Sequence, residues 1–239
     1  MSPADETLAV RNLHVHYGET CALREVDFTA RAGRTVAVVG RNGAGKSTLL
    51  KAIAGLIPGA AGSVLWNGAP LVPSLRRRLV AYLPQREAVD WDFPLTVRGL
   101  AEMGLYPVVG TWGRFTASHR AAVEAVLRRM GLEDLGNRRI GELSGGQQQR
   151  AFLARAVVGG ARILLLDEPL AGLDATAAGV ITALLRDLAG EGALVVASHH
   201  DLGSIEEAFD DLLLLRTRQL VFGPVSETLG SETMREAFA

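Results

Sequence analysis

The chain has 239 residues and a formal net charge of −1 at pH 7, which fits one large α/β domain or a domain with a substantial insertion. This charge balance gives no support for a nucleic-acid or anionic-membrane partner, because both attract strongly basic chains. The N-terminus has no basic region followed by an apolar stretch, so no signal peptide is expected. No apolar run reaches the roughly 18 residues that span a bilayer.

Alternating apolar and polar residues open the chain, and over 8–30 they predict half-buried antiparallel strands. Further on, runs such as ILLL, ALVVA and LLLL predict strands that are apolar on both faces. Such strands are typical of mostly parallel sheets covered by helices, so we expect an α/β fold. Later strands are predicted at residues 35–39, 63–66, 80–83, 163–166, 194–197, 212–215 and 219–222.

Residues 87–160 change to a helical pattern, which we interpret as a helical insertion subdomain. The α/β core would then comprise residues 1–86 and 161–239, within a single domain. Thr96 is a candidate cap for one helix of the insertion. Ser118 is a candidate cap for a longer helix that Gly131 closes.

The stretch GRNGAGKST, residues 40–48, fits the pattern G-x-x-x-x-G-K-[ST], and we call it the glycine loop. A predicted strand precedes it and a predicted helix follows it, which is the context that the motif requires. Glycines let backbone N–H groups turn toward phosphate oxygens, and a helix N-terminus adds partial positive charge. The alternative is a chance glycine turn before a helix. The residues assigned to phosphate and nucleotide binding are Gly40, Asn42, Gly43, Ala44, Gly45, Lys46, Ser47 and Thr48.

Within this loop, Lys46 is expected to reach the terminal phosphates, and the Ser47 hydroxyl is expected to bind Mg²⁺. The segment ILLLDEP places Asp167 and Glu168 where a buried strand ends. Ligands collect at the carboxyl ends of parallel strands, so both carboxylates belong at the same edge as the loop. Asp167 can then hold Mg²⁺, and Glu168 can polarise an attacking water. The alternative is a common acidic turn after a strand.

The segment LSGGQ, residues 143–147, also begins a helix. Ser144 and Gln147 fit the capping-box pattern, which is a sufficient structural explanation for those two residues. Two glycines in the first turn are poor for helix formation, and they suggest that a phosphate approaches the backbone closely. A second phosphate-binding helix start makes sense if it serves a nucleotide held by another subunit.

These motifs together resemble the ATP-binding subunits of ABC transporters, and the resemblance covers nearly all of the chain. The family order is kept by the glycine loop, Gln85, LSGGQ, ILLLDEP, GLD ending at Asp174, and HHD ending at Asp201. The resemblance implies a P-loop NTPase core, hydrolysis of ATP with Mg²⁺, and permease subunits that hold the protein on the cytoplasmic face of the membrane.

In that family two subunits enclose two ATP molecules, and the resemblance implies a homodimer here. It implies that the LSGGQ residues Ser144, Gly145, Gly146 and Gln147 contact the ATP held by the partner's glycine loop. It also implies that Asp174 communicates across the dimer.

The resemblance further implies that Tyr17 stacks on adenine, and that Gln85 reaches Mg²⁺ and senses the membrane subunit. Glu168 would be the catalytic base. A histidine would contact the γ-phosphate, and the pair His199 and His200 leaves that position open. We choose His200, since the family's histidine usually precedes an acidic residue directly.

A narrower resemblance, in residues 84–97 and in QQQRAFLARA, is to the subgroup that serves manganese, zinc and iron importers. It implies a divalent metal ion or its chelate as cargo and a solute-binding protein in the full system. Trp91 and Phe93, among Asp90 and Asp92, could form part of a groove for a helix of the membrane subunit. Internal packing of the insertion is the alternative.

Two other functions compete with transport. One is a soluble ABC ATPase, for example of the iron–sulfur assembly type. The other is a nucleotide-dependent regulatory module with little turnover, against which the intact Glu168 argues.

Overall fold

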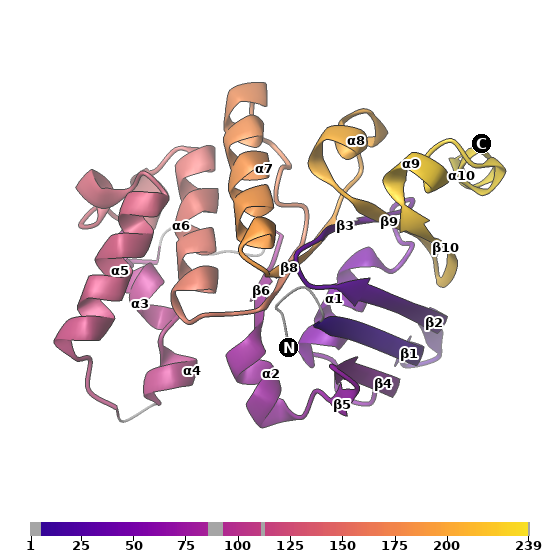
Figure 1. The fold of residues 1–239 in the computed structure, drawn as a ribbon, viewed down its shortest axis with the longest axis horizontal. Helices are drawn as coiled ribbons and strands as arrows, with labels where there is room; N and C mark the ends of the chain where they lie inside the picture. The colour runs from indigo at the N-terminus through magenta and orange to yellow at the C-terminus, as the bar shows by residue number, and fades with distance from the viewer. Residues whose placement is uncertain (1–5, 86–92, 111–112, 239) are drawn as a thin grey trace.

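The structure, a computed structural model, describes residues 6–85, 93–110 and 113–238 (Figure 1). Ten strands form one sheet in the order β5-β4-β1-β2-β10-β9-β3-β8-β7-β6. The strands are β1 (Thr7–Tyr17), β2 (Thr20–Arg31), β3 (Thr35–Val39), β4 (Ala61–Trp66), β5 (Ala69–Pro70), β6 (Val80–Leu83), β7 (Ile163–Leu166), β8 (Leu194–Ser198), β9 (Asp211–Arg216) and β10 (Arg218–Pro224).

Helices flank this sheet, and α3, α4, α5 and α6 form a group at the left of Figure 1. The helices are α1 (Lys46–Ala54), α2 (Pro73–Leu79), α3 (Val97–Met103), α4 (Tyr106–Val109), α5 (Ala117–Arg129), α6 (Gly145–Val158), α7 (Ala175–Gly190), α8 (Ile205–Ala208), α9 (Val225–Thr228) and α10 (Glu232–Phe238). Short 3₁₀ helices are formed by Glu133–Leu135, Ile140–Glu142 and Leu202–Ser204.

The predicted division of the sheet is confirmed. Strands β9, β3, β8, β7 and β6 pair in parallel, and β3, β7 and β8 are buried along their whole length. At the other side, β1 pairs antiparallel with β2 and β4. The β4–β5 hairpin turns at Asn67 and Gly68, both with positive φ as a primed turn requires. Apolar side chains on both faces of the parallel strands therefore place this half of the sheet at the centre of the core.

Helices α3, α4, α5 and α6 lie together at one side of the sheet in Figure 1, within the predicted insertion. Thr96 caps α3 as expected, since its side chain accepts a hydrogen bond from Gly99 N. The cap predicted for the longer helix is wrong: Thr116, not Ser118, is the N-cap of α5. Thr116 accepts from His119 N, and His119 Nδ1 accepts from Thr116 N, so a histidine takes the place of the usual Glu or Gln in the capping box.

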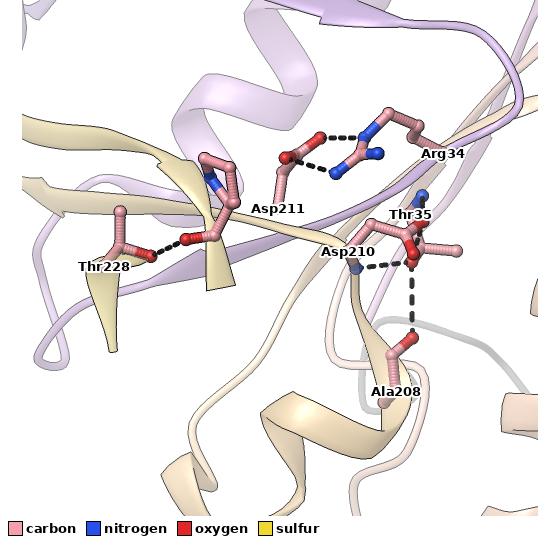
Figure 2. Close-up of polar contacts among 7 residues, drawn as sticks. Arg34, Thr35, Ala208, Asp210, Asp211 and Thr228 are labelled. Carbon is pink, nitrogen blue, oxygen red and sulfur yellow. Dashed lines mark hydrogen bonds and ion pairs between the residues drawn. The ribbon is translucent and has the colours of Figure 1, made fainter. Parts of the chain in front are cut away.

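A polar cluster fastens the N-terminal ends of β3 and β9 (Figure 2). Arg34 makes a bidentate ion pair with Asp211. Its Nε donates to Oδ2 at 2.5 Å and its Nη2 donates to Oδ1 at 2.7 Å. Beside it, Asp210 accepts from Thr35 N at 2.8 Å, and Asp210 N donates to Thr35 Oγ1 at 3.0 Å. The hydrogen bond to Asp211 raises the pKa of Arg34. This cluster lies at the sheet edge opposite the glycine loop, because the loop follows the C-terminal end of β3.

Candidate nucleotide site

The glycine loop leaves β3 and enters α1, as the motif predicts. Gly45 is the N-cap of α1 with φ 98°, a left-handed conformation that favours glycine. A Cβ atom there would lie 2.6 Å from Leu23 Cδ2 and 2.8 Å from Ala22 O, so glycine is also required sterically. The turn between β9 and β10 also contacts the glycine loop, since Thr217 N donates to Ala44 O at 2.9 Å. The left-handed glycine at position 45 and the hydrogen bond from the β9–β10 hairpin therefore hold the loop in shape.

The Lys46 side chain folds back onto the glycine loop. Its side chain is largely buried, and Nζ donates to Gly40 O at 2.9 Å and to Arg41 O at 3.3 Å. A cation held by loop carbonyls at a helix N-terminus provides a concentrated positive site. This arrangement suits the terminal phosphates of a nucleotide.

Asp167 follows β7 and is only 5% exposed. Its Oδ1 accepts hydrogen bonds from Ser47 Oγ at 3.0 Å and from Ser198 Oγ at 2.7 Å. Its Oδ2 accepts from Tyr82 Oη at 3.4 Å, and burial together with this carboxylate raises the pKa of Tyr82. The parallel register of β7 and β8 brings Asp167 and Ser198 together. Leu166 pairs with Ala197, and Asp167 and Ser198 are the residues that come next in the chain. The predicted meeting of the loop and the acidic pair is thus present in the fold.

Glu168 comes next and has φ 50°, which is uncommon for a residue with a side chain. Its backbone N donates to Ser198 Oγ at 2.7 Å. Its carboxylate Oε2 accepts from Gln85 Nε2 at 3.2 Å, so two residues 83 apart in sequence meet at the end of β6 and β7. Gln85 therefore directs its amide nitrogen at Glu168 in this structure.

An open cleft of about 840 Å³ is shared by the glycine loop, Gln85 and Glu168, whereas the buried Asp167 and Ser198 are not part of its lining. It is lined by Tyr17, Ala22, Asn42, Gly43, Ala44, Gly45, Lys46, Ser47, Thr48, Gln85, Glu168 and His200. Tyr17 stands at its margin with 51% of its surface exposed, which leaves an aromatic face available to a ligand.

The two adjacent histidines have different surroundings. His200 lines the cleft, whereas His199 is buried, with Nε2 2.8 Å from Ser204 Oγ and its ring 5.5 Å from that of Phe209. Burial and the neighbouring His200 lower the pKa of His199, and Asp201 opposes the shift. Only His200 therefore faces the space around Lys46 and Glu168.

The LSGGQ segment begins α6 with a complete capping box. Gln147 N donates to Ser144 Oγ at 3.4 Å, and Ser144 N donates to Gln147 Oε1 at 2.9 Å. Asp174 caps α7 by accepting from Ala177 N at 2.8 Å. A second, smaller pocket lies between these two helix starts, and its described lining shares no residue with the cleft.

Gly146 has a packing role that the sequence pattern did not reveal. A Cβ atom on it would lie 3.0 Å from Ala177 Cβ, so a larger residue would require the starts of α6 and α7 to shift apart by a few tenths of an ångström. This contact gives Gly146 a structural reason to be small, in addition to the close approach of a phosphate that the sequence pattern suggests.

Sequence reasoning missed Ser198 and Tyr82, which both hydrogen-bond to Asp167. The available indication for Ser198 was a hydroxyl at the end of the apolar strand LVVAS. Of the predicted groove, Asp90, Trp91 and Asp92 lie outside the described residues, and Phe93 is 56% exposed.

The chain is similar to known proteins over most of its length. Residues 23–171 match a family model described as ABC transporter. A zinc transport system ATP-binding protein, TroB of Treponema pallidum, is 43% identical over 96% of this chain and 85% of its own length. A manganese transport system ATP-binding protein, MntB of Halalkalibacterium halodurans, is 38% identical over 96% of this chain and 90% of its own.

The fold has solved counterparts as well. The structure of cbiO1 from Clostridium perfringens, part of the ABC transporter complex cbiONQ, is 25% identical, with a TM-score of 0.79 and coverage of 96% of this chain and 92% of that one. Across the described residues, none of the helices has the length and apolar character needed to cross a membrane.

Proposed function

Because this chain belongs to the ABC transporter family, whose ATP-binding subunits hydrolyse ATP, we propose that it powers an importer of a divalent metal ion, manganese or zinc. The cargo comes from the names of its relatives, since an ion carried by a membrane subunit would not touch these residues. The observation that carries the catalytic part is the single cleft that joins Lys46, Gln85, Glu168 and His200. Neither relative supports the soluble alternative.

In the bound nucleotide, adenine would stack on the exposed ring of Tyr17. The triphosphate would then follow the glycine loop, whose backbone N–H groups and Lys46 ammonium neutralise its charge. Gly43 supports this path, since a Cβ atom there would meet no described atom within 4 Å and the backbone is open to the cleft.

Ser47 Oγ and Asp167 Oδ1, 3.0 Å apart, offer the hard oxygen ligands that Mg²⁺ prefers. We assign these two residues to Mg²⁺, with Gln85 as a third candidate. When bound, Mg²⁺ would neutralise charge on the phosphate oxygens. The alternative of a simple acidic turn does not account for a buried carboxylate that accepts from a glycine-loop hydroxyl.

Hydrolysis requires a water aligned with the γ-phosphorus. Glu168 would accept a proton from this water as its oxygen bonds to phosphorus, and the bond to the β–γ bridging oxygen breaks to release ADP. Gln85, 3.2 Å from Glu168, would hold the carboxylate in place. His200, which also lines the cleft, would donate to the γ-phosphate.

A second copy of the chain would complete each cleft. The pocket at Ser144, Gly146, Gln147 and Asp174 is separate from the cleft within one chain, so its exposed helix start is available to a nucleotide held elsewhere. ATP would favour the closed dimer only by binding it more tightly than the open form. Hydrolysis would remove that preference and reopen the pair.

The chain would sit on the cytoplasmic face of the membrane through its permease, with a solute-binding protein on the other side. A groove of about 560 Å³ beside Pro84 is lined in part by Leu56, Tyr82 and Arg155. Leu56 is 57% exposed, and Phe93 is similarly exposed. Leu56 supports docking of a helix from the membrane subunit at this groove, and Phe93 supports a contact within the predicted segment.

The test is uptake by the complete complex in vesicles, with labelled manganese, zinc, iron and calcium offered separately. ATP-dependent accumulation of manganese or zinc, abolished by Glu168→Gln, is the expected result. Purification of this chain with only soluble partners, and no ion uptake, would contradict the transport role while leaving the ATPase assignment intact.

A further inference from the structure

We propose that Ser198 is a positioning residue for ATP hydrolysis, which aims Glu168 by tying its backbone to the Asp167 carboxylate. Ser198 ends β8, between β3 and β7, and its surface is 0% exposed. It lines no part of the nucleotide cleft. Any effect on catalysis must therefore pass through the groups that it contacts.

The direction of both Ser198 hydrogen bonds is fixed by chemistry. The Ser198 hydroxyl donates its one hydrogen to Asp167 Oδ1, a carboxyl oxygen that accepts it, at 2.7 Å. A backbone amide can only donate, so Glu168 N donates to the same hydroxyl oxygen at 2.7 Å. The hydroxyl thereby links two consecutive residues from the neighbouring strand.

This link matters because the Glu168 backbone is in an unusual conformation. With φ 50°, the residue turns its side chain toward Gln85 and the cleft, and such a conformation persists only where surrounding contacts impose it. The Ser198 hydroxyl is the acceptor that holds the amide of this residue. Without it, Glu168 can relax toward negative φ, and its carboxylate would move away from the attacking water.

Asp167 depends less on the same hydroxyl. It retains hydrogen bonds from Ser47 at 3.0 Å and from Tyr82 at 3.4 Å. Loss of Ser198 is therefore expected to affect turnover much more than binding of the Mg²⁺–ATP complex. A displacement of about 1 Å in a catalytic group is enough to cost roughly 10²-fold in rate.

The experiment compares Ser198→Ala with Ser198→Thr, which keeps the hydroxyl, in the chain assembled with its permease. For Ser198→Ala we expect kcat to fall about 10²-fold while the Kd for Mg²⁺–ATP changes less than about threefold. Ser198→Thr should restore most of the turnover. Should Ser198→Ala fail to fold, Ser198→Cys fills the site with a poor hydrogen-bonding group and is held to the same expectation.

A matched control removes another buried hydroxyl, at the opposite sheet edge shown in Figure 2. Thr35 is 2% exposed and bonded to Asp210, so Thr35→Val tests the effect of general destabilisation. We expect Thr35→Val to keep kcat within about twofold of the wild-type value. An equal loss in both variants would overturn the proposal.

The role of Glu168 is itself part of the proposed function, so a double variant separates the two ideas. In a Glu168→Gln background, Ser198→Ala should change the residual turnover by less than about threefold, because the group that it positions is already absent. A full, additive loss there would overturn the positioning role of Ser198. Normal turnover by Glu168→Gln alone would instead refute the catalytic base.

Discussion

Replacement of Glu168 by Gln tests the catalytic assignment most directly. The change keeps the shape of the side chain, and the amide oxygen can still accept from Gln85, 3.2 Å away. The backbone amide keeps its bond to Ser198. The fold and the nucleotide contacts should therefore survive, while the ability to accept a proton from water is lost.

The size of the effect follows from this single loss. General bases contribute about 10² to 10⁴ in rate, which corresponds to roughly 2.7–5.4 kcal/mol in the activation free energy. We expect kcat to fall within that range, while the Kd for ATP stays within about twofold of wild type. Because ATP is bound but not consumed, the closed dimer should accumulate and elute earlier in size-exclusion chromatography.

Three measurements decide the outcome: phosphate release, calorimetric affinity for ATP, and the oligomeric state with and without Mg²⁺–ATP. Glu191→Gln is the matched control, since this glutamate is exposed and pairs with Arg129 outside the cleft. It should behave like the wild type in all three. Unchanged phosphate release by Glu168→Gln would refute the reasoning, as would a variant that turns over slowly only because it no longer binds ATP.

Other changes test other parts of the structure. Lys46→Ala should weaken ATP affinity by at least about tenfold, measured by calorimetry, with Lys51→Ala on the same helix as control; equal affinities for both would contradict the phosphate contact. Asp211→Ala should lower the free energy of unfolding in urea by about 1–3 kcal/mol, because Arg34 loses its ion-pair partner. The loss stays within this range because the Arg34 side chain is 39% exposed, so water can solvate its charge. ATP affinity should not change. Since the pKa of His199 lies below its ordinary value of 6.5, the unfolded chain takes up a proton first as the pH falls. Stability should therefore decline below about pH 6.5, and His199→Gln should flatten that decline; an identical slope in both proteins would exclude His199 as the cause.

Local physics explains why much of this molecule was predictable from sequence. The conformation of the strand, glycine loop and helix at residues 35–54 depends mainly on residues close to one another in sequence. The structure has these elements where the sequence pattern predicts them. The turn between β4 and β5 has a local cause too, because positive φ at Asn67 and Gly68 favours those residue types. The cap of α5 was misplaced by two residues, since Thr116 and Ser118 are both good caps and the local pattern does not distinguish them.

By itself, the sequence determined the order of the motifs, the buried character of the parallel strands and the chemistry of the loop and the acidic pair. Tertiary structure alone decided which side chains meet. Ser198 reaches Asp167, 31 residues away, only because β8 lies beside β7, and Gly146 is constrained only because α7 begins against it. The same holds for the two histidines. His199 is buried against Phe209, whereas His200 lines the cleft. The physical reason is that periodicity and turn chemistry act over a few residues, whereas these contacts depend on the order of strands in the sheet.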